Sequence, residues 1–323
     1  MKKETVILAS GEGKNRYCAF PSITETNGHI LCAWKQGTGH ASSGDAAYLE
    51  MTADGEILRS GVIPNTDGAI WQNTELIKMP DGSAVCWIDK QNGNNKRLGA
   101  QAYRYTPAGF EPIPGGLTDT EGKRYGYVFD GTLWNGRYYL LAMTFPELDA
   151  AGKRKTVELL SSEDGGTWRD ELCLDAVCNY PLNESSFAAI GDTLFILCRS
   201  YRPEAPLIAV DGGMNVLRQT VFGEENGICS IGRPKLFIKD GGLYGIMRNH
   251  RAAKSPMELA LLQIDPETLS IVRYTVLDDE KPADGYYAEP YFDGASFNVV
   301  TYRISGRDSS DILLLRYDWG ELS

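Results

Sequence analysis

The chain has 323 residues and a formal net charge of −11, with 35 glycines, 17 tyrosines and 6 tryptophans. This length allows a large core, either in one β domain or in two smaller domains. The acidic balance argues against a nucleic-acid partner, because binding to a phosphate backbone needs a basic patch. The apolar run near the N-terminus is too short for a signal peptide, and no later run could span a membrane. We therefore expect a cytoplasmic protein, unless a leader has been removed, and the sequence does not specify its oligomeric state.

The seven cysteines include no Cys-x-x-Cys pair, and Cys32, Cys86 and Cys198 lie inside apolar, strand-like runs. Buried free thiols are therefore the expected state, which suits a reducing compartment. The three histidines are scattered, and no spacing typical of a zinc site is present. We expect neither a metal nor a cofactor.

An apolar run that follows a turn recurs along the chain, and no long stretch has a helical period. The six copies are His29–Trp34, Ser83–Ile88, Tyr138–Met143, Leu194–Arg199, Leu243–Arg248 and Phe297–Tyr302. Their starts are separated by 54, 55, 56, 49 and 54 residues. This spacing is typical of the four-stranded blade of a β-propeller, with each run as the second strand.

Shorter segments before and after each run supply the other strands. The expected first strands are Pro21–Thr24, Thr74–Lys78, Gly131–Trp134, Ser185–Ala189, Pro234–Ile238 and Pro290–Phe292. The sixth copy lacks a fourth strand, which the N-terminal run Thr5–Ser10 can supply, so that no sheet edge is left open.

The predicted fold is an all-β, six-bladed β-propeller of four-stranded antiparallel blades, closed by the N-terminal strand. It forms a single domain over residues 1–323. The blades cover approximately residues 18–63, 70–114, 126–174, 179–222, 228–277, and 284–319 together with 5–10. The alternative is a β-sandwich or a pair of β domains.

A distinctive turn is predicted in Glu158–Trp168, between the third and fourth strands of the third copy. Asp164 can accept backbone N–H bonds across the turn, and the glycines that follow it allow positive φ. The pattern of Ser162, Asp164, Gly166, Thr167 and Trp168 resembles the Asp box of sialidases and other BNR-repeat proteins, one residue short before the threonine. The Asp box is structural, so it indicates a fold and not a reaction.

Polar residues stand at the head of most first strands, where a propeller would bring them to one mouth of its channel. These positions are Phe20, Asn73, Asp130, Glu184, Arg233 and Glu289. The second strands end on Arg199 and Arg248, with Arg303 one step later in the sixth copy. Acids and arginines facing one pocket suit an anionic or polyhydroxylated ligand, although a structural channel mouth can also be polar.

The resemblance to sialidases covers most of the chain at low similarity and implies roles for particular residues. It makes Asp45 the acid/base, Tyr287 or its neighbour Tyr286 the nucleophile, and Glu184 the base that accepts the phenol proton. It makes Arg199 one of the anion-binding arginines, with further candidates in Arg233, Arg248 and Arg251. The remaining residues expected to contact substrate are Asp130, Glu289, Asn73, Trp71 and Arg16.

One departure from the family affects substrate recognition. Ala19 stands where sialidases have their first arginine, and Arg16 lies three residues earlier. The expected activity is therefore that of a sialidase-like exo-glycosidase acting on a terminal acidic sugar, with sialic acid itself in doubt. The alternatives are a propeller glycosidase that uses a carboxylate pair on another sugar, and a non-catalytic glycan-binding propeller with aromatic residues such as Trp71 and Trp134 at its site. Fold does not decide between these functions.

Overall fold

The computed structural model describes residues 3–79, 81–94, 96–148, 154–304 and 309–322. By its internal contacts the chain divides into two compact units. Unit 1 consists of the described residues within Met1–Val128, Phe145–Gly152 and Glu289–Ser323. Unit 2 consists of those within Phe129–Thr144 and Lys153–Ala288.

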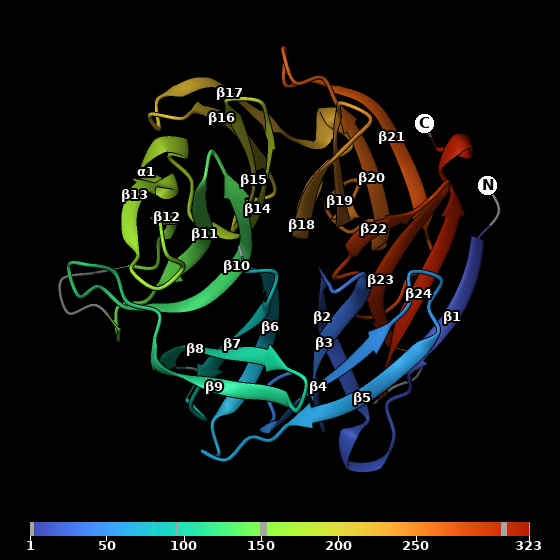
Figure 1. Cartoon of the computed structure of the whole chain (residues 1–323). Coiled ribbons are helices and arrows are strands. Elements are labelled where there is room, and N and C mark those ends of the chain that lie inside the picture. Colours follow the sequence, from blue (N-terminus) through green and yellow to red (C-terminus); the bar gives the residue numbers. More distant parts are fainter. Residues whose placement is uncertain (1–2, 80, 95, 149–153, 305–308, 323) are drawn as a thin grey trace. The chain divides into compact units, whose positions relative to one another are not determined.

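Four separate sheets have four antiparallel strands each, joined in sequence order (Figure 1). The first is β6 (Ile70–Lys78), β7 (Ala84–Gln91), β8 (Arg97–Thr106) and β9 (Gly109–Gly116). The second is β10 (Tyr125–Trp134), β11 (Arg137–Thr144), β12 (Val157–Ser162) and β13 (Arg169–Cys173). The third is β14 (Leu182–Ile190), β15 (Thr193–Ser200), β16 (Ala205–Asp211) and β17 (Val216–Phe222). The fourth is β18 (Cys229–Lys239), β19 (Gly242–His250), β20 (Glu258–Ile264) and β21 (Ile271–Asp278).

The other eight strands belong to one sheet, all of it in unit 1. Its strands are β1 (Lys3–Ala9), β2 (Tyr17–Thr26), β3 (His29–Gly37), β4 (Gly44–Met51), β5 (Ile57–Ile63), β22 (Glu289–Asp293), β23 (Ser296–Ile304) and β24 (Ser310–Asp318). The described helices are short: α1 (Leu174–Cys178), η1 (Gly13–Asn15), η2 (Glu224–Asn226) and η3 (Trp319–Glu321). None of them has the length and apolar character that a bilayer-spanning helix requires.

The prediction of six separate blades is wrong: the propeller has four blades, and the strands expected to form the first and sixth blades are joined. Tyr17 of β2 pairs in parallel with Ser310 of β24. The Ser310 N–H also donates to the Arg16 carbonyl at 2.9 Å, and its hydroxyl donates to the Cys18 carbonyl at 2.7 Å. A repeat in the sequence shows where strands recur, but not that neighbouring copies become hydrogen-bonded to each other.

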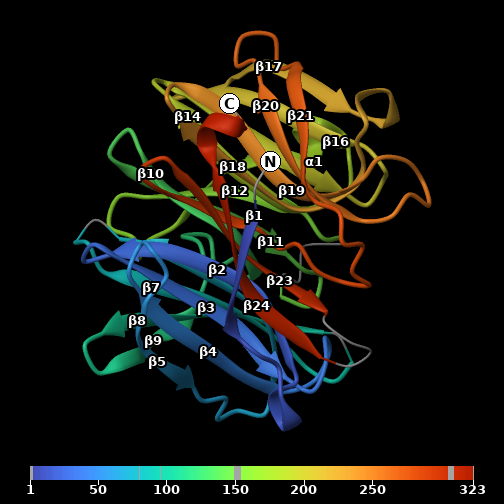
Figure 2. The same cartoon turned by 90° about the vertical axis from the view of Figure 1, so that its right-hand side faces the viewer.

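The expected pairing of the N-terminal strand with the last strand is present. β1 runs antiparallel to β24, with Lys3 opposite Tyr317 and Val6 opposite Leu314, and Figure 2 shows the two strands side by side. Elements from the two ends of the chain thus share one sheet within unit 1.

Two-residue turns between first and second strands follow the chemistry that the sequence predicts. Asn27 and Gly28 both have positive φ (52° and 77°), as do Asn135 and Gly136 (49° and 75°). Positive φ at both central residues is the type I′ pattern, whose twist matches that of the strands it joins. The turns therefore fix the register of each hairpin and the direction in which its side chains point.

The Asp box sequence forms the predicted turn between β12 and β13. Asp164 Oδ1 accepts the backbone N–H groups of Gly166 at 2.8 Å and Thr167 at 2.7 Å, and the Ser162 hydroxyl at 2.9 Å. These donors hold the pKa of Asp164 well below its usual range. Trp168 is buried beside the turn, as expected of its apolar side chain.

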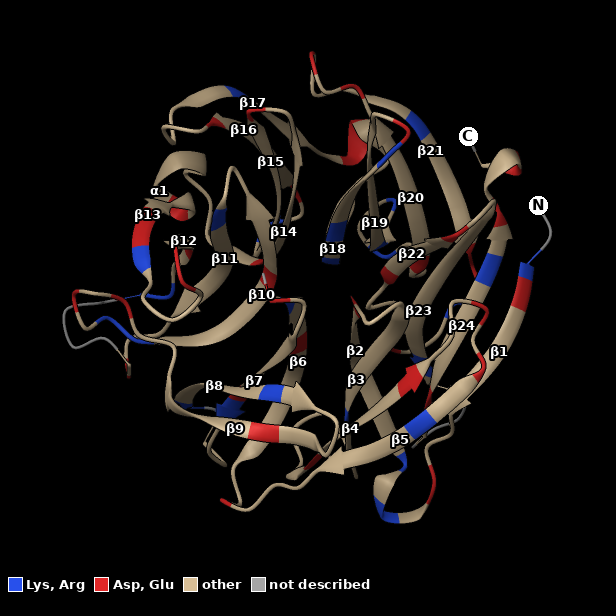
Figure 3. Cartoon of the chain, in the orientation of Figure 1, with Lys and Arg blue, Asp and Glu red and all other residues tan. Residues whose placement is uncertain are grey.

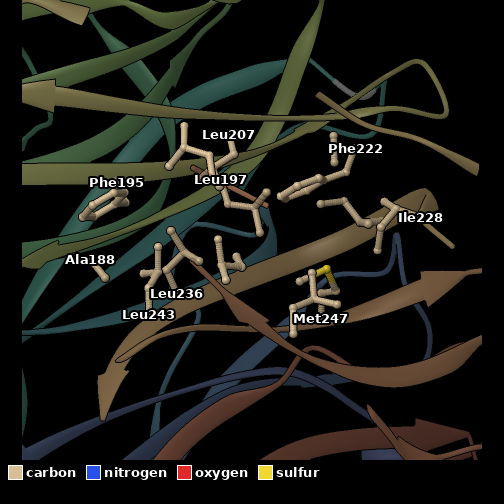
Figure 4. Packing of buried hydrophobic residues seen from close by; sticks show 14 of the residues in the cluster. Ala188, Phe195, Leu197, Leu207, Phe222, Ile228, Leu236, Leu243 and Met247 are labelled. Carbon is tan, nitrogen blue, oxygen red and sulfur yellow. The ribbon is translucent and has the colours of Figure 1, made fainter. Parts of the chain in front are cut away.

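Apolar side chains from adjacent sheets of unit 2 make one continuous core. Phe195, Leu197 and Leu207 of the β14–β17 sheet pack with Leu236 and Met247 of the β18–β21 sheet (Figure 4). Burial on both faces explains why the central strands read as unbroken apolar runs. The seven cysteines carry no disulfide, and all except Cys173 are buried, so the prediction of free, mostly buried thiols is confirmed.

Candidate functional site

The Tyr287 hydroxyl donates a hydrogen bond of 2.5 Å to Glu184 Oε1. Glu184 lies on β14, and Tyr287 lies in the segment that follows β21, so both belong to unit 2. Burial, and next the Glu184 charge, raise the pKa of the Tyr287 phenol. The phenol is therefore neutral near pH 7 and already points its proton at a carboxylate.

Arg199 holds the other oxygen of the same carboxylate. It is the penultimate residue of β15, and its Nη1 contacts Glu184 Oε2. Burial acts to raise the pKa of Glu184, but the charge of Arg199, the Tyr287 hydroxyl and the charge of Arg248 together hold that pKa below its ordinary value. Glu184 therefore carries a negative charge at neutral pH although its side chain is only 6% exposed.

Arg248, at the end of β19, brings a second guanidinium to the tyrosine. Its Cζ lies 5.7 Å from the Tyr287 ring centroid, and its Nη1 lies 3.2 Å from Asp284 Oδ1. Gly232 stands opposite Arg248 in the pairing of β18 with β19. Any side chain on Gly232 would overlap the guanidinium, since a β-carbon there would lie 2.3 Å from Arg248 Nε.

Arg233 supplies a third guanidinium from an unusual backbone position. Its Cζ lies 6.0 Å from the Tyr287 ring centroid, and the residue is almost wholly buried. Its φ is +38°, although it precedes Pro234, which favours an extended backbone. Strained, buried residues of this kind are retained where the surrounding structure fixes them, and functional sites are rich in them. Figure 3 shows Lys/Arg colouring on β18, which carries Arg233.

β-bulges place two of these residues, Glu184 and Arg233, as well as two more of the positions expected to head first strands. The pairing register shifts between Leu182 and Ser185, around Glu184, and between Gly232 and Lys235, around Arg233. The same irregularity surrounds Phe20 on β2 and Asn73 on β6. A bulge inserts one residue and redirects a side chain, and bulges often lie beside active sites.

Asp130 has a different environment from Glu184, the other predicted acid of unit 2. Its Oδ2 accepts the Ser186 hydroxyl at 2.6 Å and the Phe187 N–H at 3.2 Å, and Lys235 Nζ lies 2.8 Å from its Oδ1. The carboxylate thus joins β10 to β14 and β18. These contacts occupy both oxygens and favour a structural role for Asp130.

Five predicted site residues fall in unit 1. Asp45 is the second residue of β4 and accepts the Asn65 N–H at 2.8 Å, and Arg16 is an exposed residue whose Nε donates to the Thr38 carbonyl. Trp71 belongs to a buried apolar cluster, while Glu289 is buried at the start of β22. The Asn73 side-chain amide is 3.5 Å from Asp89 Oδ2.

The Asp89 environment was not predicted from the sequence. Burial raises the pKa of Asp89 to about 6, against the opposing charge of Arg97, which contacts its Oδ2. Nearby, burial lowers the pKa of Lys35 to about 8, and Lys35 Nζ donates to the carbonyls of His40 at 2.9 Å and Ser42 at 2.8 Å. Lys35 directly follows the apolar run His29–Trp34, and nothing in the sequence indicates that it is buried. Only the three-dimensional arrangement reveals this cluster.

Contacts within unit 2 therefore bring together Glu184, Arg199, Arg233, Arg248 and Tyr287, all of them predicted. Sequence reasoning missed Gly232 and Asp284, which lie one and three positions before predicted residues. Their closeness in sequence to Arg233 and Tyr287 was the one feature that could have indicated a place at the site. The described residues contain no group of three or more His, Cys, Asp or Glu side chains placed to hold a metal ion.

No protein-family model matches the sequence, and comparison with curated protein sequences finds no match. Solved structures do resemble the fold. A Dyadobacter fermentans protein of unknown function has a TM-score of 0.74 at 14% identity, over 98% of this chain and 99% of that one. Trypanosoma rangeli sialidase in complex with the inhibitor DANA gives 0.69 at 11% identity, over 99% of this chain. A K499G mutant of NanB sialidase from Streptococcus pneumoniae gives 0.68 at 12% identity, over 98% of this chain and 71% of that one.

The chain spans 60% of the length of the Trypanosoma rangeli sialidase. At such low identities these likenesses concern the fold alone. The chain thus has a sialidase-like β-propeller fold.

Proposed function

We propose that this protein is a sialidase-like exo-glycosidase that hydrolyses a terminal acidic sugar from a glycan or oligosaccharide. The observation that carries the proposal is the 2.5 Å hydrogen bond from the Tyr287 hydroxyl to Glu184, with three arginines around the pair. The fold likeness to two sialidases provides a propeller fold compatible with this reaction, but does not itself assign the reaction.

Tyr287 would be the nucleophile in this reaction. Its phenol oxygen attacks the anomeric carbon, the bond from that carbon to the leaving oxygen breaks, and the phenol proton passes to Glu184, so that a covalent glycosyl–tyrosine and the free leaving alcohol result. A neutral phenol avoids the repulsion that a carboxylate nucleophile would meet from an acidic substrate. Water then releases the sugar in a second displacement, so the product should retain the configuration of the substrate.

The arginines would recognise the anionic group of the sugar. Guanidinium groups bind carboxylates through paired hydrogen bonds, and they remain charged at every physiological pH. Arg199 has the further task of keeping Glu184 ionised, since its charge holds the Glu184 pKa down. Protonation of the leaving oxygen is a separate task, which the resemblance to sialidases assigns to Asp45.

A panel of aryl glycosides that includes aryl sialosides and uronides tests the proposal. Wild type, Tyr287→Phe, Glu184→Gln and Tyr286→Phe should be compared at equal concentration. Loss of the nucleophile or its base should lower kcat on the order of 10³-fold or more, within the range that such groups contribute. Tyr286→Phe is the matched control, because it removes the neighbouring phenol, and it should retain turnover.

The outcomes separate the candidate functions. If Tyr286→Phe fails while Tyr287→Phe is active, the nucleophile is wrongly assigned. If no glycoside is turned over by wild type but a glycan binds saturably, the hydrolase proposal is wrong and a glycan-binding propeller replaces it. Turnover limited to neutral glycosides would retain the reaction and change the substrate class.

A further inference from the structure

We propose that Asp284 is an internal counter-ion of the anion-recognition group Arg248, and that it weakens binding of acidic ligands and so determines specificity. This inference rests on the proposed function, because it takes the arginines around Tyr287 to be the groups that bind the ligand's anionic group. It adds a residue that neither the sequence motifs nor the fold likeness assigns.

The geometry of Asp284 places its carboxylate on Arg248. Its Oδ1 lies 3.2 Å from Arg248 Nη1 and accepts the Gly285 backbone N–H at 3.0 Å. Both side chains retain access to solvent, with Asp284 26% and Arg248 15% exposed. The ion pair is therefore only partly buried.

The other carboxylate at the site has a different task. Glu184 is almost fully buried and shares its two oxygens between the Tyr287 hydroxyl and Arg199, as the proposed proton transfer requires. Asp284 is the more exposed acid, and it accepts bonds from Arg248 and from the Gly285 N–H. The proposed proton transfer from Tyr287 to Glu184 does not use its charge, yet Asp284 faces the same guanidinium that would meet a substrate anion.

A ligand carboxylate that bonds Arg248 must lie close to the Asp284 carboxylate. Like charges at such separations oppose binding, and the partial burial of both side chains limits screening by solvent. A neutral hydroxyl or amide on the ligand would not suffer this repulsion. Asp284 would thus weaken the binding of small anions that contact Arg248 alone. Sugars whose acidic group also contacts another arginine would be affected less, because the second guanidinium offsets the repulsion.

Substitution by asparagine isolates the charge from the geometry. The amide oxygen that Asp284→Asn introduces can accept the same bonds from Arg248 and the Gly285 N–H, so Arg248 keeps its position. Asp284→Ala removes both the charge and these bonds. A difference between the two variants therefore separates repulsion of the ligand from positioning of Arg248.

Calorimetric titration of the whole chain with N-acetylneuraminate, with glucuronate and with their methyl esters provides the test. Asp284→Asn should bind at least one of the acids on the order of tenfold more tightly than wild type, while affinity for the uncharged esters stays the same. Raising the salt concentration should reduce the gain. Thermal unfolding of each variant confirms that it is folded.

Equal or weaker acid binding by folded Asp284→Asn would overturn the inference, as would a failure of both wild type and variant to bind either acid. An unchanged Asp284→Asn with a weakened Asp284→Ala would make Asp284 a positioning residue instead. The readout is binding, so it does not depend on turnover. If Asp284→Asn binds acids more tightly but wild type hydrolyses no glycoside, the hydrolase proposal fails while the counter-ion role of Asp284 holds.

Discussion

Arg248 lies across Gly232 so closely that a single methyl group on the glycine could not be accommodated without movement of the guanidinium. A β-carbon would stand 2.3 Å from Nε and 2.5 Å from Nη2. The strand pairing of these two residues thus decides where one of the proposed anion-binding groups can be.

Gly232→Ala should displace the Arg248 guanidinium without altering any charge. Because the clash involves the far end of a flexible side chain, the fold should survive while acid-ligand affinity falls by about tenfold. Calorimetric titration with N-acetylneuraminate measures the effect. Gly166→Ala is a matched control, because a β-carbon there meets only ordinary contacts with Asp164; equal affinity in both variants would show that Arg248 does not bind the anion.

The Glu184 carboxylate should make stability depend on acid pH. Its folded pKa is lowered from an ordinary value of 4.5. Its contribution is therefore fully present above about pH 4.5 and is lost as the pH falls through the lower, folded pKa. Denaturant unfolding of wild type and Glu184→Gln between pH 2 and 6 should show a gap that narrows as the pH falls; a gap independent of pH would contradict the ionised state of Glu184.

Lys35 should produce a second rise of stability with pH, in the alkaline range. Its folded pKa is about 8 and its ordinary value is 10.5, so between these values the unfolded chain binds more protons. Stability should rise across that window by about 3 kcal/mol through this residue, because one pKa unit corresponds to about 1.4 kcal/mol. Urea titrations from pH 7 to 10.5 measure the free energy of unfolding, and Lys35→Met should lack this rise. If the free energy of unfolding of Lys35→Met changes with pH in parallel with that of wild type, the prediction is wrong.

The resemblance-based role of Asp45 can be tested through the leaving group. A general acid matters greatly for a poor leaving group and little for a good one. Asp45→Asn should therefore lose about 10²-fold or more in kcat/KM on methyl glycosides or oligosaccharides, and much less on nitrophenyl glycosides. An equal loss on both substrates would assign Asp45 to structure, through its bond to the Asn65 N–H.

The Asp130–Lys235 pair should be a strong stabilising contact of unit 2. Asp130→Ala leaves the part-buried Lys235 charge and the Ser186 hydroxyl without this acceptor, at a cost of about 3 kcal/mol. Because the two residues interact, the double variant with Lys235→Ala should be destabilised by less than the sum of the single changes. Additive losses in chemical denaturation would show that the pair contributes little.

The hairpins of this fold could be predicted because local chemistry specifies them. Asn27-Gly28 and Asn135-Gly136 adopt the positive φ values that a type I′ turn requires. The Asp164 turn forms between the expected strands. The position of Glu184 relative to Arg199 also followed from the repeat, since each lies at a strand end. In these places the structure is determined by residues that are close together in the sequence, so the sequence pattern predicts it.

Other features depend on contacts between residues far apart in the chain. A β-bulge adds one residue to a strand without giving that strand a distinctive composition. The residues around Glu184 and Arg233 therefore did not predict the register shifts there. Trp71 was expected at a ligand site but packs in a core cluster, which its apolar ring also allows. Asp284 was not predicted, because its contact with Arg248 spans 36 positions of the chain.

The parallel contact at Tyr17 and Ser310 and the antiparallel pairing of β1 with β24 leave the last strand covered by the first residues of the chain. Without that cover, the Ile312–Tyr317 stretch would present unpaired backbone groups beside a run of leucines, which is the kind of edge that recruits strands from other molecules. By occupying this edge, β1 opposes self-association, because an incoming copy of the chain could pair with β24 there only by displacing β1.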